Sequence, residues 1–279
     1  MPGLSGMKRA AFVLMFALLW GCSSMPSRFV ALSEAGGPDV PVGEMLKAVA
    51  NGPVIFVGES HTNSRDHYVQ LEVIKYLYKH GKNPVIALEM FPEGMQLELN
   101  RWVDGKMDKG TFRQMYHSVW NIPFDNYEKI FDYAREKKIP LVGVNVRKEL
   151  IKEVSERGVG VVSRESLERI KFTPCSEEPE YARTFGLGKD RVEHESRMIY
   201  LCDAQRFRDA VMAYYISQLA RMDKGTVVVL LGAAHAAKAS VPAMLERQMN
   251  VKYSVLMPES FRDMTGKEPD ARLADYLWY

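Results

Sequence analysis

Cysteine is scarce in this sequence, with three residues in 279. Their spacing matches neither the closely paired cysteines of a structural zinc site nor the dense framework of a small disulfide-stabilised domain. Cys22 lies near the start of the chain, so Cys175 and Cys202 are the two cysteines within the body of the sequence. A disulfide between them and a pair of buried free thiols both fit the sequence.

An excess of charge of one sign is also missing, because 37 basic and 35 acidic residues leave a formal net charge of +2. Two of the positive charges, Lys8 and Arg9, lie in an N-terminal segment without acids, so the remainder carries +2 − 2 = 0. Nucleic-acid-binding proteins usually present a basic patch, and no block of lysine and arginine occurs here. The composition therefore argues against nucleic acid as a partner.

No hydrophobic run reaches the roughly 20 residues that a membrane-spanning helix needs. The apolar run over residues 10–19 is shorter, follows Lys8 and Arg9, and ends in Leu19-Trp20-Gly21-Cys22. This order resembles a bacterial lipoprotein signal peptide with its lipobox, the alternative being an uncleaved N-terminal anchor. We expect residues 1–21 to be removed and Cys22 to carry a lipid that tethers the chain to a membrane. Ser23 in the following position favours the outer membrane of a Gram-negative cell envelope.

Four stretches are apolar throughout, as expected for strands covered on both faces. They cover residues 54–58, 84–88, 140–144 and 226–231, and residues 253–257 are a fifth candidate. Helical periodicity occupies residues 66–80, 127–138 and 192–221 between them. Strands that alternate with helices predict an α/β fold with a mostly parallel sheet flanked by helices. Residues 92–125 form a helical, aromatic insertion.

The boundaries follow from this pattern. Residues 22–44 are small, polar and contain proline and glycine, which predicts a flexible tether. Residues 45–260 are long enough for one domain with a substantial core, and residues 261–279 remain as a C-terminal tail.

Polar side chains follow each of the predicted strands. Glu59 and His61 come after the first, Glu89 after the second, Asn145 after the third and His235 after the fourth. Parallel strands carry their ligand sites outside their carboxyl ends, so these side chains are expected to meet at one edge of the sheet. Charged residues seldom lie beside buried strands unless they are paired or functional.

Two chemistries fit this set. His61, Glu89 and His235 offer nitrogen and oxygen ligands for a divalent metal ion. Alternatively, His61 acts as a general base that Glu59 positions, without metal. In a third interpretation, the polar cluster only organises the loops of a scaffold protein.

Aromatic residues are concentrated between residues 112 and 133, where they form either a satellite core or a pocket for a flat apolar ligand. Haem iron accepts histidine or tyrosine as an axial ligand, and this stretch offers Tyr116, His117 and Tyr127.

The motifs together resemble the ChaN-type haem-binding lipoproteins, which are related to the erythromycin-esterase-like and Tiki proteins. The resemblance covers roughly residues 48–258 and rests on the motifs in their order. They are Val54-Ile-Phe-Val-Gly-Glu-Ser-His61, Ala87-Leu-Glu-Met-Phe91, Pro140-Leu-Val-Gly-Val-Asn145, Ala204-Gln205 with Arg208-Asp209, and Leu231-Gly-Ala-Ala-His235.

This resemblance implies a haem-binding lipoprotein of haem or iron acquisition. Its implied partners are haem, a second copy that pairs around the haem, and an outer-membrane haem or iron receptor. Tyr127 and His194 are the implied haem ligands, and Gln205 and Asp209 join the polar cluster. The wider superfamily implies the alternative of an extracytoplasmic metal-dependent hydrolase with Glu59, His61, Glu89 and His235 as its catalytic residues.

Overall fold

The structure is a computed structural model that describes residues 28–32, 37–178, 181, 196–261 and 270–279. The segment on which the lipoprotein prediction rests, including Cys22, lies outside these ranges, and so does His194.

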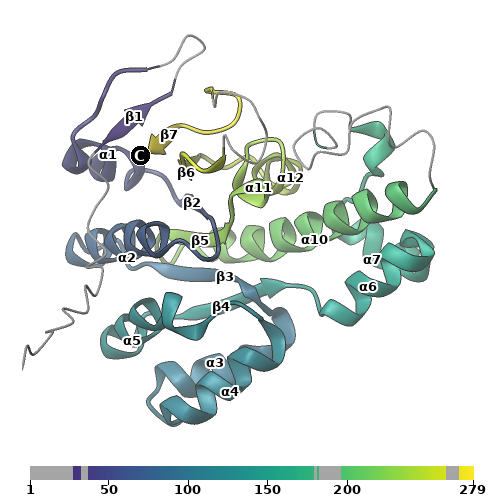
Figure 1. Ribbon diagram of the computed structural model, residues 1–279, viewed down its shortest axis with the longest axis horizontal. Coiled ribbons are helices and arrows are strands. Elements are labelled where there is room, and N and C mark those ends of the chain that lie inside the picture. Colours follow the sequence, from purple (N-terminus) through teal and green to yellow (C-terminus); the bar gives the residue numbers. More distant parts are fainter. Residues whose placement is uncertain (1–27, 33–36, 179–180, 182–195, 262–269) are drawn as a thin grey trace, which may run out of the picture.

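Within the described residues, seven strands form one sheet in the order β1-β7-β6-β2-β5-β3-β4 (Figure 1). Every neighbouring pair is parallel except β1 and β7, which are antiparallel. The predicted α/β fold with a mostly parallel sheet is therefore confirmed. The strands are β1 (Phe29–Ala31), β2 (Val54–Glu59), β3 (Val85–Pro92), β4 (Leu141–Asn145), β5 (Val227–Gly232), β6 (Tyr253–Pro258) and β7 (Tyr276–Trp278).

The central strands are apolar throughout because both faces of the sheet are covered. On β2, Ile55 and Val57 point into one hydrophobic cluster, while Val54 and Phe56 point into the other. All four side chains are fully buried. The alternation of side chains along a strand thus divides a single apolar run between two cores.

The helices that precede β4 in the sequence cover one face of the sheet, and those that follow it cover the other. The first face is packed by α1 (Val42–Val49), α2 (Ser64–Lys79), α3 (Gln96–Val103), α4 (Lys109–Val119) and α5 (Glu128–Lys137). The second is packed by α6 (Lys148–Arg157), α10 (Ser196–Arg221), α11 (Ala233–Ala236) and α12 (Val241–Gln248). Within the described residues, the remaining helical elements are α7 (Arg164–Arg169), η1 (Glu93–Met95), η2 (Phe124–Asn126), η3 (Val159–Val161) and η4 (Cys175–Glu177).

Local sequence explains where several helices begin and end. The side chain of Asn63 accepts a hydrogen bond from the backbone N–H of Arg65 at 3.0 Å, which caps α2. Asp108 caps α4 in the same way through Thr111. Lys138 ends α5 in the left-handed conformation, at φ 55°, before Pro140 starts the approach to β4.

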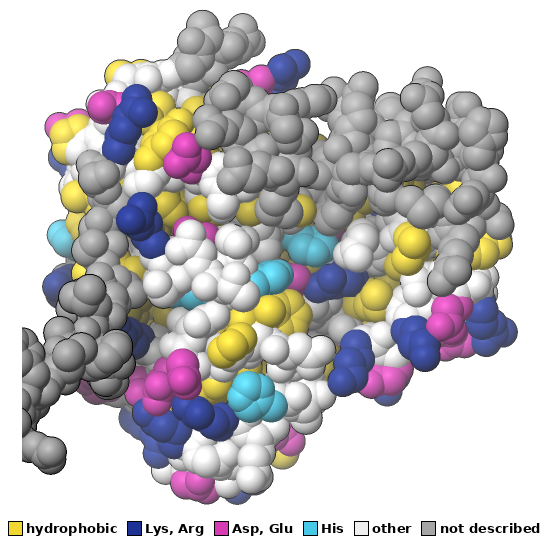
Figure 2. All heavy atoms as spheres, in the orientation of Figure 1, with side chains coloured by type: hydrophobic (Ala, Val, Ile, Leu, Met, Phe, Trp, Pro, Cys, Tyr) yellow, Lys and Arg dark blue, Asp and Glu magenta, His cyan; other side chains and the backbone are white. Residues whose placement is uncertain are grey.

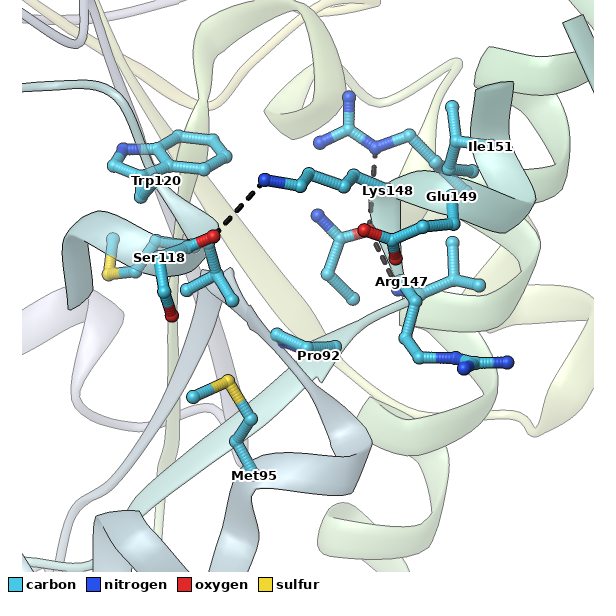
Figure 3. Close-up of a pocket in the computed structure, with 13 residues that line it drawn as sticks. Pro92, Met95, Ser118, Trp120, Arg147, Lys148, Glu149 and Ile151 are labelled. Atoms are coloured by element: carbon cyan, nitrogen blue, oxygen red, sulfur yellow. Dashed lines mark hydrogen bonds between the residues drawn. The ribbon is translucent and has the colours of Figure 1, made fainter. Parts of the chain in front are cut away.

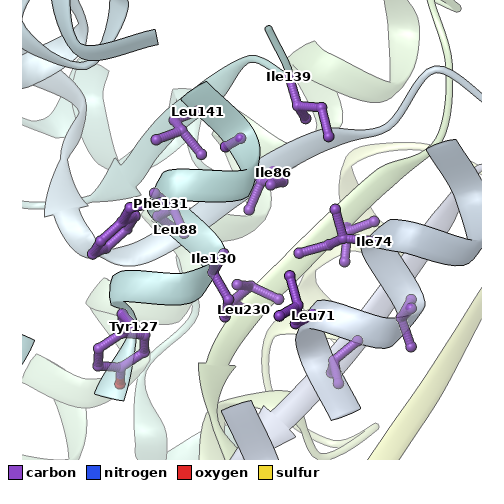
Figure 4. Packing of buried hydrophobic residues seen from close by; sticks show 14 of the residues in the cluster. Leu71, Ile74, Ile86, Leu88, Tyr127, Ile130, Phe131, Ile139, Leu141 and Leu230 are labelled. Carbon is purple, nitrogen blue, oxygen red and sulfur yellow. The ribbon is translucent and has the colours of Figure 1, made fainter. Parts of the chain in front are cut away.

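The aromatic stretch over residues 112–133 is mainly a core. Phe112, Tyr116, Phe124, Tyr127 and Phe131 are all buried, and their ring pairs are edge-on, tilted or stacked at centroid distances of 5.2–6.1 Å. Figure 4 shows Tyr127 and Phe131 among the aliphatic residues of this cluster. The satellite-core interpretation therefore holds for these five residues, and none of them offers a face to a flat ligand.

Two regions differ from the sequence-based boundaries. The expected tether contributes β1, and the expected C-terminal tail contributes β7, which pairs with it. Both strands are too short, at three residues each, to stand out as a hydrophobic period. Trp278 on β7 is buried, and its indole Nε1 donates to Asp66 at 3.0 Å. The other oxygen of Asp66 accepts from the backbone N–H of Ser60 at 2.8 Å, so β7 supports the turn after β2.

The structure pairs Cys175 with Cys202 in a disulfide. The bond joins η4 to α10 across a sequence separation of 27 residues.

Candidate functional site

The turn after β2 carries a buried carboxylate, Glu59, at the last position of the strand. Its Oε1 accepts from His61 Nδ1 at 2.7 Å and from the hydroxyl of Tyr127. Its Oε2 accepts from Gln70 Nε2 at 2.7 Å and lies 3.2 Å from His67 Nδ1. Both oxygens of Glu59 are thus fully engaged, and the carboxylate has no capacity left for an external ligand.

These contacts set the protonation of the turn. Burial alone raises the pKa of Glu59, but hydrogen bonds from His61 and His67 outweigh it and bring the pKa down to about 2. Burial lowers the pKa of His61, yet the bond to Glu59 and the charges of Glu89 and Glu59 raise it overall. Glu59 is therefore an anion at neutral pH, fixing Nδ1 of His61.

A second buried carboxylate, Glu89, lies on neighbouring β3. Arg208 of α10 donates through Nη2 to its Oε1 at 2.6 Å, and the backbone N–H of Gly232 donates to its Oε2 at 2.6 Å. Burial raises the pKa of Glu89, but the nearby charges of His235 and Arg208 lower it overall. The carboxylate is anchored at the carboxyl end of the sheet, between β3 and β5.

The second imidazole, His235, follows β5 on the short helix α11. Its Nδ1 lies 2.5 Å from Oδ1 of Asp209, and its Nε2 lies 3.7 Å from Oε1 of Glu89. The other oxygen of Asp209 accepts from the hydroxyl of Tyr181 at 2.9 Å. His235 is 8% exposed, whereas His61 is 34% exposed. His61 is consequently the imidazole open to solvent.

Asn145 and Gln205 complete the cluster from β4 and α10. The Nδ2 of Asn145 donates to the backbone oxygen of Glu89 at 2.8 Å. Arg208 reaches Asn145 Oδ1 at 3.4 Å and Gln205 Oε1 at 3.3 Å. The structure thus brings Glu59, His61, Glu89, Asn145 and His235 together at the carboxyl ends of parallel strands, where Gln205 and Asp209 of α10 join them.

Gly232 allows the two halves of the cluster to approach each other. A Cβ at this position would lie 3.0 Å from Cε1 of His61, 3.1 Å from its Nε2 and 3.7 Å from Oε2 of Glu89. The backbone of Gly232 is in an ordinary conformation, at φ −56°, so space rather than φ demands glycine here.

The predicted metal ligand set of His61, Glu89 and His235 is not formed. Among the residues that the structure describes, no group of three or more His, Cys, Asp or Glu side chains is placed to hold a metal ion. The physical reason is that Arg208 occupies one oxygen of Glu89 and the backbone of Gly232 the other. The positive charge of the Arg208 guanidinium beside Oε1 of Glu89 disfavours a second cation there.

The predicted haem ligand Tyr127 lies in the core. Its side chain is fully buried, and its hydroxyl donates to Glu59. Burial and the adjacent Glu59 raise its pKa, which favours the neutral phenol. In this position Tyr127 has no surface that a haem could reach, and the other predicted ligand, His194, lies outside the described residues. Of the two residues considered beside it, Tyr116 is buried and His117 is exposed.

Sequence reasoning missed four residues that hold the site together: His67, Gln70, Tyr181 and, as a partner of Glu89, Arg208. His67 and Gln70 occupy one face of α2, and their three-residue spacing is the available signal. Arg208 belongs to the motif around Ala204 and Asp209, and its position there does not indicate that it pairs with Glu89. Tyr181 stands in a stretch without periodicity, so no sequence signal marks it.

A cavity of about 370 Å³ opens beside the cluster, between α4, α6 and the ends of β3 and β4 (Figure 3). Its apolar lining comes from Met90, Pro92, Met95, Val119, Trp120, Val146 and Ile151. Its polar lining includes Arg147, Lys148 and Glu149, all exposed, and Arg208. Figure 3 shows Lys148 extending across the cavity toward the side on which Ser118 and Trp120 lie, with Nζ donating to the backbone oxygen of Ser118 at 3.1 Å. Trp120 also packs edge-on against His61, with ring centroids 5.2 Å apart.

The surface agrees with this arrangement. Figure 2 shows histidine side chains near the centre of one face, with basic and hydrophobic side chains beside them. Among the described residues, no helix is long and apolar enough to cross a bilayer.

Comparison with known proteins assigns the class. Residues 45–245 match the family model described as haem-binding uptake, Tiki superfamily, ChaN. The chain therefore belongs to this haem-binding uptake family, and within the Tiki superfamily it is a ChaN-type member.

Solved structures agree in fold. The structure titled cofacial heme binding to ChaN of Campylobacter jejuni is 17% identical, with a TM-score of 0.67, and the match covers 91% of this chain and 97% of that one. A mutant of the erythromycin esterase EreC in its open conformation is 12% identical, with a TM-score of 0.51, over 82% of this chain and 76% of that one. Similarities at these identities establish the fold alone.

A curated relative is the chloroplastic protein RETICULATA-RELATED 5 of Arabidopsis thaliana, 26% identical over 284 aligned positions. The match covers 92% of this chain, which spans only 38% of the length of that relative.

Proposed function

We propose that this protein binds haem in the cavity beside the polar cluster and serves in haem or iron acquisition as a lipoprotein. The family to which residues 45–245 belong supports haem as the ligand. The lipobox around Cys22 supports a lipid tether to the outer membrane of a Gram-negative cell envelope. A haem or iron receptor in that membrane is the partner that such a role requires.

The observation that carries the proposal is the composition of the cavity wall. Methionine, valine and tryptophan side chains suit the apolar faces of a porphyrin, and Arg147 and Lys148 suit its anionic propionates. A volume of about 370 Å³ is within the range of small-molecule sites. Haem, when bound, supplies an iron that accepts imidazole or phenolate as a ligand. His61 is a partly exposed imidazole in contact with Trp120, which lines this cavity.

A cavity of this size buries only part of a haem, which leaves porphyrin surface for another protein to cover. We propose a second copy of the chain as that protein.

Haemin titration of the full chain in mild detergent tests the proposal. We expect saturable binding with a defined Soret band and, for Arg147→Ala/Lys148→Ala, about tenfold weaker binding, equivalent to two partly exposed charge pairs. Lys152→Ala on the same helix is the matched control, because the Lys152 side chain is 75% exposed and lies outside the cavity lining. Non-saturable binding, or equal binding by all three proteins, would contradict the proposed site.

The arrangement of Glu59, His61, Glu89 and His235 favours a second candidate function, hydrolysis without a metal ion. Glu59 fixes Nδ1 of His61, which leaves Nε2 of this solvent-accessible imidazole to accept a proton from water. His235 is fixed in the same manner by Asp209, which provides a second acid–base group across Glu89.

Chromogenic aryl esters provide the test of this candidate. Hydrolysis should persist in EDTA and be lost in His61→Ala and in His235→Ala, while His80→Ala, which changes an exposed histidine, should remain active. Absence of EDTA-resistant hydrolysis across the ester panel removes this candidate and leaves haem binding untouched.

A further inference from the structure

The two imidazoles of the site share one three-part arrangement. In the first, the hydroxyl of Tyr127 donates to Glu59, which binds Nδ1 of His61. In the second, the hydroxyl of Tyr181 donates to Asp209, which binds Nδ1 of His235. Nδ1 of each imidazole is therefore hydrogen-bonded to a carboxylate, and each carboxylate accepts a hydrogen bond from a buried tyrosine.

Asp209 needs such a partner because its side chain is fully buried. A buried carboxylate oxygen without a hydrogen bond is destabilising, and His235 uses only Oδ1. Tyr181 is 1% exposed and supplies a hydrogen bond to the other oxygen, Oδ2, at 2.9 Å. With one donor on each oxygen, the carboxylate plane is held in a single orientation towards Nδ1 of His235.

Tyr181 and the segment before it both contact α10. The guanidinium of Arg206 lies 5.1 Å from the centre of its ring, and the same guanidinium donates to the backbone oxygen of Thr173 at 2.5 Å. Cys175 forms a disulfide with Cys202, and its backbone N–H donates to Asp203 at 2.7 Å.

These anchors share a helix with the carboxylate that Tyr181 contacts. Cys202, Arg206 and Asp209 follow one another at spacings of four and three residues, so they occupy one face of α10. That face binds both the segment before Tyr181 and the tyrosine itself.

We propose that Tyr181 is a positioning residue for His235: through Asp209 it fixes the imidazole with Nδ1 bound and Nε2 directed at Glu89. This inference rests on the second candidate function, in which His235 is an acid–base group. Burial raises the pKa of Tyr181 well above its ordinary value, so its hydroxyl remains a neutral donor across the physiological range.

Proton NMR of the full chain tests the assignment without any substrate. The Nδ1 proton of His235, bonded to Asp209 at 2.5 Å, should give a resolved low-field signal that disappears in His235→Asn. In Tyr181→Phe this proton should exchange with water about two- to tenfold faster, which is what the loss of one hydrogen bond is worth. Backbone amides of α10 should exchange at unchanged rates, because a merely structural defect would accelerate them as well.

The matched control is Tyr253→Phe. The hydroxyl of Tyr253 also donates to a carboxylate, that of Glu246, over a distance of 2.5 Å, and this pair lies outside the site. The control should leave the His235 signal unchanged. In an Asp209→Asn background, Tyr181→Phe should have no further effect on His235, because the coupling runs through that carboxylate. An unchanged exchange rate in folded Tyr181→Phe, or an equal effect of the control, overturns the proposal.

A measurement that leaves Tyr181 in place covers the case in which Tyr181→Phe fails to fold. The hydroxyl proton of Tyr181 should be protected from exchange in the unmodified protein, and its chemical shift should change in His235→Asn, because both side chains bind the carboxylate of Asp209. A hydroxyl signal that is the same in both proteins overturns the proposal. None of these NMR measurements requires hydrolysis of a substrate. A protein that hydrolyses no ester would therefore remove the second candidate function, while the NMR results would still decide whether Tyr181 positions His235.

Discussion

Arg208 and Glu89 are 119 positions apart in the sequence and form an ion pair of 2.6 Å at the carboxyl end of the sheet. The carboxylate is 2% exposed and the guanidinium 15% exposed. This pair joins β3 to α10 and fixes the carboxylate that both imidazoles face.

Arg208→Met should therefore be strongly destabilising. Removal of one partner leaves the other charge buried and unpaired, with an expected loss of about 3 kcal/mol in the free energy of unfolding. Urea denaturation measures it. Arg157→Met is the control, because its pair with Glu153 is exposed and should contribute less than about 1 kcal/mol. Equal small losses for both variants would contradict a central role for the Arg208–Glu89 pair.

Glu59 should make the protein sensitive to acid. Its folded-state pKa, about 2, is below its ordinary value of 4.5, so ionised Glu59 stabilises the fold above pH 4.5. That stabilisation, about 3 kcal/mol from the difference in pKa, is lost as the pH falls from 4.5 towards 2. Urea denaturation between pH 6 and pH 3 should show the loss in the unmodified protein. Glu59→Gln should be less stable at pH 6 and should show a smaller change with pH; an identical pH dependence in both would rule this account out.

Gly232→Ala should displace His61. The added Cβ meets Cε1 and Nε2 of the imidazole at 3.0 and 3.1 Å, and we expect a cost of about 1–3 kcal/mol. The NMR signals of the His61 ring should shift, and the raised pKa of His61 should fall towards that of an ordinary histidine. Gly94→Ala is the control, because an added Cβ there meets nothing within 4 Å. A His61 signal unaffected by Gly232→Ala would show that the turn yields without moving the ring.

Loss of the disulfide should reduce stability without unfolding the sheet. Cys175 and Cys202 close a loop with a separation of 27 residues, for which a loss of about 3 kcal/mol is expected. Urea denaturation of Cys175→Ser/Cys202→Ser measures it. The unmodified protein in reductant should match this variant, and the variant should not respond to reductant. A variant as stable as the oxidised protein would show that the bond contributes nothing to folding.

Apolar runs made the central sheet predictable. Strands β2, β3, β4 and β5 are buried on both faces, and their continuous hydrophobic stretches have few alternative explanations. Their parallel order then explains why Glu59, Glu89, Asn145 and His235 converge, since each follows the carboxyl end of a strand.

The support around these residues could not be predicted in the same way. Tyr181 contacts Asp209 from a stretch of sequence without periodicity. Arg208 contacts Glu89 from α10, a helix in which polar and apolar residues are not separated onto two faces. Metal binding by His61, Glu89 and His235 was one of the chemistries that fit the sequence, because a sequence lists which ligands are available but not which of them are already hydrogen-bonded. Tyr127 was expected at iron for the same reason, while in the structure its hydroxyl is bound to Glu59.

The hydrogen bond from Trp278 to Asp66 has a consequence for biosynthesis. It spans 212 positions, and Asp66 in turn holds the N–H of Ser60 in the turn after β2. A ribosome delivers Glu59 and His61 first and β7 long afterwards, at about 5–20 residues per second. The growing chain therefore lacks the hydrogen bond from Trp278 to Asp66 for on the order of ten seconds or more. The turn after β2 gains this support only when β7 has joined the sheet.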